Sequence, residues 1–248
     1  RNKKQVREAL KNIDCIVHLA ALVGDPACKL SPKATEDINY KGTKILCDLA
    51  KNAGIKRFIQ ISTCSNYGIS KINNPATEES ELHPISLYAQ TKIAAEKYVI
   101  QEASDVFSVC ILRLATVYGI SPRMRFDLLV NEIVRDAFLT KKVIVYQPKA
   151  FRPFIHVSDV ARAINDCINA SGKRINGEIF NVGSRNYQKQ EVITHLKKYL
   201  PECRAEIVDT FTDRRDYSVS FKKIEKTLGF KTKININEGI EEMLNALQ

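Results

Sequence analysis

The sequence has neither a long hydrophobic run nor a cysteine pattern of the kind that secreted proteins use. Its longest clean apolar stretch, "CIVHLAALVG", has the length of a buried strand and its exit, which is too short to span a membrane. The seven cysteines are odd in number, scattered and without a C-x-x-C pair, so we expect reduced thiols and a cytoplasmic protein. The sequence thus predicts no membrane span and no metal site.

Glycine is sparse where a dinucleotide-binding protein usually concentrates it. The ten glycines never form G-x-G-x-x-G or G-x-x-G-x-x-G, so no turn that cradles a pyrophosphate is visible. A dense basic block is also absent, because the lysines and arginines behind the net charge of +10 are spread over all segments. We therefore expect no nucleic-acid partner and, instead, anionic small molecules such as phosphates.

What the 248 residues do contain is an alternation of short runs rich in valine and isoleucine with longer helical patterns. Strands buried on both faces and alternating with helices predict an α/β fold with a doubly wound parallel sheet of the Rossmann type. Ligands bind at the carboxyl edge of such a sheet. The first expected strands are 15–20, 57–62 and 107–115, with helices at 31–52 and 86–102.

After residue 120 the alternation of strand and helix patterns becomes less regular. We predict that residues 1–120 and 154–183 form the dinucleotide-binding part, and that residues 121–153 and 184–248 form a smaller, largely C-terminal substrate-binding part. The further expected elements are strands at 142–147, 154–157 and 177–183, a helix that ends at 170, and helices near 127–139, 188–200, 222–228 and 237–247.

Tyr88 and Lys92 stand four residues apart in "YAQTK", on an expected helix, so their side chains share one face. A phenol beside an ammonium group should have a pKa below its usual value of about 10, because the positive charge favours the phenolate. Such a phenolate could act as a general base toward a hydroxyl group. The pair alone is equally compatible with one turn of an ordinary surface helix.

The segment "FIQISTCSNYG" gives this pair a context. An apolar strand ends here in Ser62 and Thr63, which places two hydroxyl groups at the carboxyl edge of the sheet, where they can bind a substrate oxygen. Either hydroxyl could instead cap a turn. The order of strand, Ser-Thr, loop and Tyr-x-x-x-Lys helix favours a catalytic site.

With these residues in view, the sequence resembles the extended short-chain dehydrogenases/reductases that modify sugar nucleotides, the NAD-dependent sugar-nucleotide epimerase/dehydratase family. The resemblance implies oxidation of a nucleotide-activated sugar, most often at C4, with NAD as cofactor and NADP as the alternative. The matching segments are "DCIVHLAA", "INYKGTKILCDLAKNAGIKRFIQISTCSNYG", "EESELHPISLYAQTKIAAE", "LRLATVYG", "RPFIHVSDVARAI", "FNVG" and "RRDYSVSFKKIEKTLGF".

The resemblance also implies roles for single residues. Thr63, Tyr88 and Lys92 would form the catalytic set: Tyr88 would remove the proton of a sugar hydroxyl and Thr63 would bind the same oxygen. Lys92 would hold the nicotinamide ribose and lower the pKa of Tyr88. The family often has asparagine where Thr116 stands, which leaves that residue only a general contact. The implied cofactor contacts, besides Tyr88 and Lys92, are Leu19, Ala20, Ala21, Asn39, Ile61, Ser62 and Thr116.

Arginines would bind the substrate diphosphate, because a guanidinium group makes two-point contacts with phosphate. By the resemblance, Arg152 makes one such contact, although Pro153 follows where the family commonly has aspartate. Arg215, or Arg214 beside it, makes the second. Arg123 and Arg125 could add further substrate contacts or form a basic loop.

The reaction itself stays open at this point. A 4,6-dehydratase would carry acidic residues directly after the threonine, where this chain has Cys64 and Ser65, so dehydration is disfavoured. A C4 epimerase or a 4-dehydrogenase needs no further group, and Cys64 could also serve a 3- or 5-epimerase as acid or base. The segments around "ISPRMR" most resemble heptose-nucleotide 4-dehydrogenases of surface-polysaccharide pathways. The alternative from another class is a noncatalytic relative that binds nucleotide, RNA or a partner protein.

Two expectations concern the whole protein. The family begins with two strand-helix units of about 30 residues each, and we expect these units, with their glycine-rich turn, to be absent from this chain. The helices expected at 31–52 and 86–102 carry apolar residues on more than one face. Because relatives pair the equivalent helices in a four-helix contact, we expect a homodimer.

Overall fold

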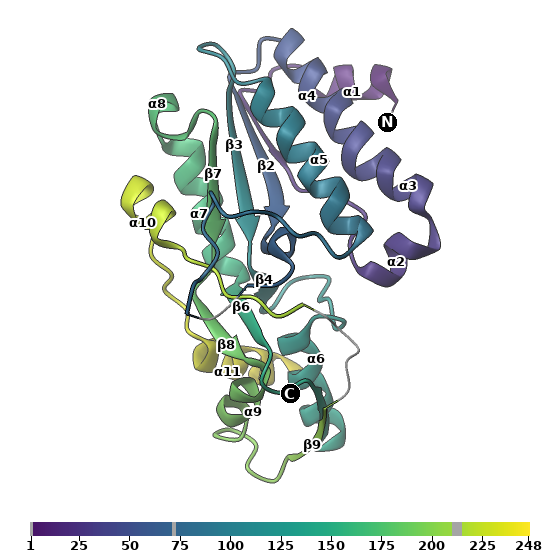
Figure 1. Cartoon of the computed structure of the whole chain (residues 1–248), viewed down its shortest axis with the longest axis vertical. Coiled ribbons are helices and arrows are strands. Elements are labelled where there is room, and N and C mark those ends of the chain that lie inside the picture. The colour runs from purple at the N-terminus through teal and green to yellow at the C-terminus, as the bar shows by residue number, and fades with distance from the viewer. Residues whose placement is uncertain (1, 71–72, 210–214) are drawn as a thin grey trace.

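The main sheet consists of four parallel strands in the order β1-β2-β3-β7 (Figure 1). The structure is a computed structural model that describes residues 2–70, 73–209 and 215–248. Thr63 pairs with Leu114, and Leu114 pairs with Val182, so three of the strands end at the same level. These strands are β1 Cys15–His18, β2 Arg57–Thr63, β3 Ser108–Leu114 and β7 Glu178–Val182.

Helices cover both faces of this sheet. Side chains alternate along each strand, so neighbouring residues contribute to different cores. Phe58 and Ile111 pack in the core beneath α4 and α5, whereas Ile59 and Leu112 pack in the core beneath α7. The predicted α/β fold with a doubly wound parallel sheet is thereby confirmed. The helices are α4 Thr43–Asn52 and α5 Leu87–Gln101 on one face and α7 Val157–Asn169 on the other.

The helix expected at 31–52 is divided by a π-helical turn. This turn, η1 (Asp37–Gly42), lies between α3 (Pro32–Glu36) and α4 and carries the buried Asn39. Such turns occur often at functional sites. Two helices that the sequence did not predict, α1 (Lys3–Ala9) and α2 (Asp25–Leu30), lie beside α4 and close to α5, respectively. A short 3₁₀ turn, η2 (Cys64–Tyr67), follows β2 directly.

The lower part of the molecule in Figure 1 has two smaller sheets and a core of its own. The buried residues of this core come from 118–154 and 187–244. The predicted division of the chain between two parts stays a prediction. The strands are β4 Thr116–Tyr118, β6 Phe151–His156 and β8 Arg185–Gln188 in one sheet, and β5 Lys142–Tyr146 and β9 Arg204–Val208 in the other. The helices are α6 Leu129–Thr140, α9 Lys189–Leu196 and α11 Ile236–Leu247, with α8 Gly172–Ile175 and α10 Lys222–Leu228 beside β7.

All seven cysteines are free, and six of them are buried. Within the described ranges, no helix has the length and apolar character needed to cross a bilayer. The same residues contain no group of three or more His, Cys, Asp or Glu side chains that could hold a metal ion. The cytoplasmic location and the homodimer stay predictions.

Candidate active site

A cavity of about 660 Å³ opens at the carboxyl edge of the main sheet, between the sheet and the lower part of the molecule. Ala20 and Asn39 are not among the described residues that line it, and Arg214 lies outside the described residues. Of the residues predicted from the sequence, those that line the cavity are Leu19, Ala21, Ile61, Ser62, Thr63, Tyr88, Lys92, Thr116, Arg123, Arg125, Arg152 and Arg215.

The three residues of the predicted catalytic set come together in this cavity. Thr63 ends β2, while Tyr88 and Lys92 stand one turn apart on α5, which begins where the Ser86 side chain accepts a hydrogen bond from the backbone N–H of Ala89. The Thr63 hydroxyl accepts a hydrogen bond from the backbone N–H of Ser65, at 3.1 Å. Its own hydrogen is therefore free to be donated toward the Tyr88 phenol or a substrate oxygen.

The electrostatics of Tyr88 differ from the sequence-based expectation. Burial raises the pKa of Tyr88 to about 12, because removal from water disfavours the phenolate. The charge of Arg125 and a hydrogen bond with Thr63 oppose this rise. The predicted lowering of the Tyr88 pKa by Lys92 is therefore not found, since burial outweighs the neighbouring charges and the cation that acts on the phenol is Arg125.

Lys92 is a buried cation that faces the cavity. Its exposed fraction is 3%, and burial lowers the pKa of its ammonium group to about 8, against the opposing charge of Glu96. No residue in the described part of the chain accepts a hydrogen bond from this ammonium group. A desolvated donor of this kind needs oxygen acceptors from a ligand, and the ribose hydroxyls of a nicotinamide cofactor would supply them. The chain's residues thus fit this part of the cofactor.

Behind the cavity lies a buried polar network that the sequence reasoning missed. Glu96 accepts three hydrogen bonds from the guanidinium of Arg113, the shortest 2.7 Å, and further ones from Asn66 and from the Ser62 hydroxyl. Arg113 also donates to the hydroxyl of Tyr67, at 2.9 Å. The sequence does contain a signal for this network. Arg113 is a charged residue within the apolar strand "SVCILRL", and Glu96 lies four residues after Lys92 on the buried face of α5.

Asn39 holds the loop after β1. Its side chain accepts a hydrogen bond from the backbone N–H of Leu22, at 2.7 Å, and donates to the carbonyl of the same residue, at 2.9 Å. It also donates to the Thr91 hydroxyl on α5, at 3.2 Å. The structure therefore places Asn39 where it positions the loop that carries Leu19 and Ala21, rather than in the cavity wall.

Four of the predicted substrate arginines line the same cavity. Arg152 is buried and stands over the ring of Tyr217, with 5.4 Å between the guanidinium carbon and the ring centroid. Arg215 lies 3.9 Å from the carboxylate of Asp25, and Arg125 lies 2.5 Å from that of Asp127. Arg123 lines the same cavity from an exposed position. Lining residues that the sequence reasoning did not single out include Asp25, Asp127, Asn131, Lys189 and Tyr217.

Two further residues have structural roles. Cys64 is fully buried, hydrogen bonds to the carbonyl of Arg113 at 3.1 Å, and has a thiol whose pKa is raised by burial. It does not line the cavity, so the structure gives no support to an acid or base role for it. His156 caps α7 by accepting a hydrogen bond from the backbone N–H of Ser158, at 3.3 Å, and packs against Tyr118.

Comparisons with known proteins identify related sequences and a related fold. A UDP-glucuronate 4-epimerase of Thermodesulfobacterium geofontis is 28% identical, over 94% of this chain and 72% of that protein. A dTDP-D-glucose 4,6-dehydratase of Mus musculus is 28% identical, over 94% of this chain and 67% of that protein. The solved structure of MoeE5 in complex with UDP-glucose and NAD is 26% identical, with a TM-score of 0.86 over 98% of this chain and 83% of that one. A profile described as the NAD dependent epimerase/dehydratase family matches residues 1–183. The chain therefore belongs to the NAD dependent epimerase/dehydratase family.

Proposed function

We propose that this protein oxidises a nucleotide-activated sugar at C4 with NAD, as a sugar-nucleotide epimerase or 4-dehydrogenase of surface-polysaccharide biosynthesis. The observation that carries the proposal is the convergence of Thr63, Tyr88 and Lys92 on one cavity that four arginines also line. A hydroxyl-oxidising group and a diphosphate-binding wall in the same cavity are what a sugar nucleotide requires.

The chain's own residues supply proton transfer and orientation. NAD, when bound, supplies the hydride acceptor. Tyr88 removes the proton of the sugar hydroxyl, and Thr63 donates a hydrogen bond to the same oxygen. Lys92 contributes its positive charge beside this proton transfer and holds ribose hydroxyls. Because the phenol has a pKa of about 12 without ligands, Tyr88 depends on nearby positive charge, which Arg125 supplies, to reach the phenolate form.

The residues after Thr63 favour epimerisation or simple oxidation over dehydration. Dehydration at C5 and C6 needs an acid and a base beyond the catalytic tyrosine. Ser65 lines the cavity in this region, and the Cys64 thiol points away into the core with a raised pKa. Neither group is a carboxylate, although a relative of similar identity is named as a dehydratase.

Product analysis tests the proposal. The full-length protein is incubated with NAD and UDP-, dTDP-, GDP- or CDP-sugars, heptose nucleotides included, and products are followed by reduced-nicotinamide absorbance and by NMR of the sugar. We expect a C4 epimer or a 4-ketosugar, and a loss of at least about a hundredfold in rate for Tyr88→Phe. Retention of full activity by Tyr88→Phe contradicts the proposed catalytic set. A complete lack of turnover favours the noncatalytic alternative, and a 4-keto-6-deoxy product identifies a dehydratase.

A further inference from the structure

His18 is a buried histidine to which the proposed reaction gives no role. It ends β1, directly before the loop that carries Leu19 and Ala21 to the cavity, and it is 8% exposed. Burial, with the charge of Lys92 as the second cause, lowers the pKa of its imidazole to about 4. At neutral pH the ring is therefore uncharged, so one of its two nitrogen atoms carries a hydrogen and the other does not.

The hydrogen bonds around His18 identify the nitrogen that carries this hydrogen. Nε2 of His18 lies 3.0 Å from the hydroxyl oxygen of Thr43, which begins α4. The Thr43 hydroxyl has one hydrogen and donates it to the backbone carbonyl of Asn39, at 2.8 Å, because a carbonyl oxygen can only accept. The same hydroxyl must therefore accept from the imidazole. His18 is thus the tautomer with its hydrogen on Nε2.

The Thr43 hydroxyl replaces a backbone donor in the π-helical turn η1. In a regular α-helix the N–H of Thr43 would bond to the carbonyl of Asn39, four residues before it. Here that N–H bonds to the carbonyl of Tyr40 instead. The hydroxyl supplies a hydrogen bond to the Asn39 carbonyl, and the imidazole on β1 fixes the direction in which the hydroxyl points. His18 therefore supports the turn that carries Asn39.

The Asn39 side chain extends this series of hydrogen bonds in two directions. It exchanges two hydrogen bonds with the backbone of Leu22, and its remaining N–H donates to the Thr91 hydroxyl. Thr91 in turn donates to the carbonyl of Tyr88, at 2.9 Å. Each hydrogen in the series has its own acceptor, so the direction of every bond is fixed. The series joins His18 to the loop after β1 and to the first turn of α5, which carries Tyr88.

We propose that His18 is a positioning residue for NAD binding: its Nε2–H group, acting through Thr43 and Asn39, holds the loop after β1 in the shape that binds the cofactor. His18 is not among the described residues that line the cavity, so its effect is indirect. The inference goes beyond the proposed function, because it does not depend on which sugar is oxidised. The residues of this loop that line the cavity are Leu19, Ala21, Val23 and Gly24.

The tautomer is measured first, in the full-length protein without sugar or NAD. Nitrogen NMR distinguishes the two neutral tautomers of an imidazole, and the His18 signals are those that disappear in His18→Gln. We expect the Nε2–H form at neutral pH. Thr43→Val keeps the shape of threonine but removes the acceptor, so it should give a mixture of the two forms. A hydrogen on Nδ1 in the unaltered protein overturns the inference, whatever the variants do.

Calorimetric titration with NAD measures the consequence in matched pairs of variants. His18→Gln places an amide N–H group near the position of Nε2, whereas His18→Asn places its amide near Nδ1 and leaves Thr43 without this donor. We expect His18→Asn and Thr43→Val to raise the Kd of NAD about tenfold, which corresponds to the loss of one hydrogen bond. His18→Gln and Thr43→Ser keep the contact and should stay within about threefold of the unaltered protein.

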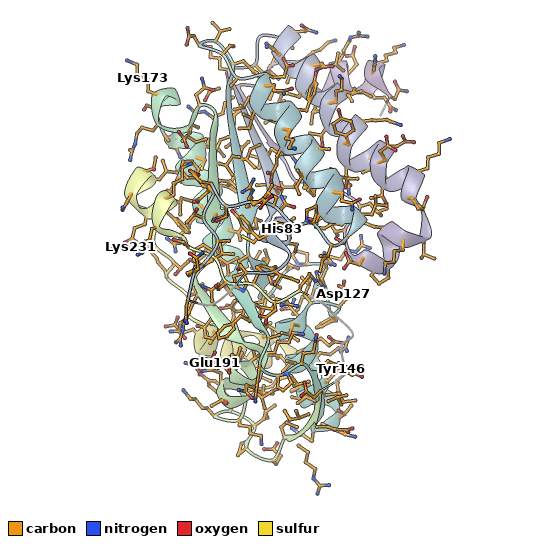
Figure 2. The ribbon with its side chains drawn as sticks, viewed as in Figure 1. His83, Asp127, Tyr146, Lys173, Glu191 and Lys231 are labelled. Atoms are coloured by element: carbon orange, nitrogen blue, oxygen red, sulfur yellow. The ribbon has the colours of Figure 1, made fainter. Side chains whose placement is uncertain are left out.

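Asn176→Ala is the control for a general loss of stability. Asn176 accepts a hydrogen bond from the Val109 N–H and donates one to the Ser104 carbonyl, both at 3.1 Å, near the amino end of β3. Figure 2 shows Lys173, which lies on α8 just before this residue, at the upper end of the molecule, whereas Asp127 of the cavity lies near its waist. Asn176→Ala should lower the unfolding temperature and leave NAD binding unchanged.

A double variant tests whether His18 and Thr43 act together. His18→Asn with Thr43→Val should bind NAD about as weakly as either single variant, because both changes remove the same contact. Multiplied losses in the double variant overturn the inference. Equal losses in His18→Gln and His18→Asn also do so, because the donor at Nε2 is then not what matters. Unchanged NAD affinity in His18→Asn and Thr43→Val does so as well, and so does an equal loss in Asn176→Ala. None of these measurements uses a sugar, so each result is independent of the test of the proposed function.

Discussion

Nη2 of Arg113 lies 2.7 Å from Oε2 of Glu96, and both side chains are almost fully buried, with exposed fractions of 4% and 3%. The pair stands directly behind the end of β2, because Glu96 also accepts the hydroxyl hydrogen bond of Ser62. A buried pair of opposite charges is stable only while both members are present, since the loss of one leaves the other desolvated and unpaired.

We predict that Arg113→Met lowers the free energy of unfolding by about 3–5 kcal/mol. The double variant Arg113→Met with Glu96→Leu should be clearly more stable than the Arg113→Met single variant, because no unpaired buried charge remains. Urea unfolding of the two single variants and the double variant measures the coupling. Additive effects of the two substitutions contradict a coupled pair.

Asn39 gives a second prediction, which separates positioning from direct cofactor contact. Asn39→Ala removes both hydrogen bonds to Leu22, so it should cost about 1–3 kcal/mol of stability and weaken NAD binding through the displaced loop. Asn39→Asp keeps the acceptor for the Leu22 N–H and should be intermediate in stability. Urea unfolding and calorimetric titration with NAD measure the two effects. Weaker NAD binding at unchanged stability identifies the direct contact that the sequence implied.

The sequence predicted those features that depend on local pattern. The strand that ends at Thr63 and the helix that places Tyr88 and Lys92 on one face are both properties of a few consecutive side chains. The fold class followed from the alternation of strand and helix patterns, and the family resemblance identified twelve of the residues that line the cavity. The π-helical turn around Asn39 could not be predicted from the sequence. The spacing of side chains indicates a helix, but it does not determine which backbone carbonyl accepts the hydrogen bond of each N–H group.

The features that the sequence missed depend on distant contacts. The Glu96–Arg113 pair joins α5 to β3, and Tyr217 reaches the cavity from near the end of the chain. The error about the pKa of Tyr88 has the same origin. The spacing of Tyr88 and Lys92 showed a neighbouring charge, but the water excluded by residues from other segments is visible only in the folded chain, and that desolvation dominates.

The buried ammonium group of Lys92 should destabilise the fold, although the proposed function needs it. Its pKa falls from an ordinary value of 10.5 to about 8, so the folded chain binds its proton less tightly than the unfolded chain does. We predict that Lys92→Met raises the free energy of unfolding by about 1–3 kcal/mol at pH 7 and leaves only a low residual activity. The gain should shrink as the pH rises from about 8 to 10.5, because the folded chain then releases the buried proton, and the cost of that release falls to zero as the pH approaches the unfolded pKa. Lys97→Met, an exposed change on the same helix, should alter stability little. Chemical denaturation across this pH range checks the trend, and a constant gain contradicts it.

The pH dependence of catalysis follows from the same two groups. The active form needs Tyr88 as phenolate and Lys92 as ammonium, with pKa values of about 12 and about 8 in the unliganded protein. Below pH 8 the ammonium is fully present and the phenolate fraction grows tenfold per pH unit, so log kcat/KM should rise with unit slope. Above pH 8 the loss of ammonium offsets the gain of phenolate, and the profile should become level rather than fall.

Lys92→Met removes the offsetting group, so its low residual activity should continue to rise through pH 8 and up to about pH 10. A profile of kcat/KM for both proteins measures this, and a level profile below pH 7 in the unaltered protein contradicts the assignment of Tyr88 as the base.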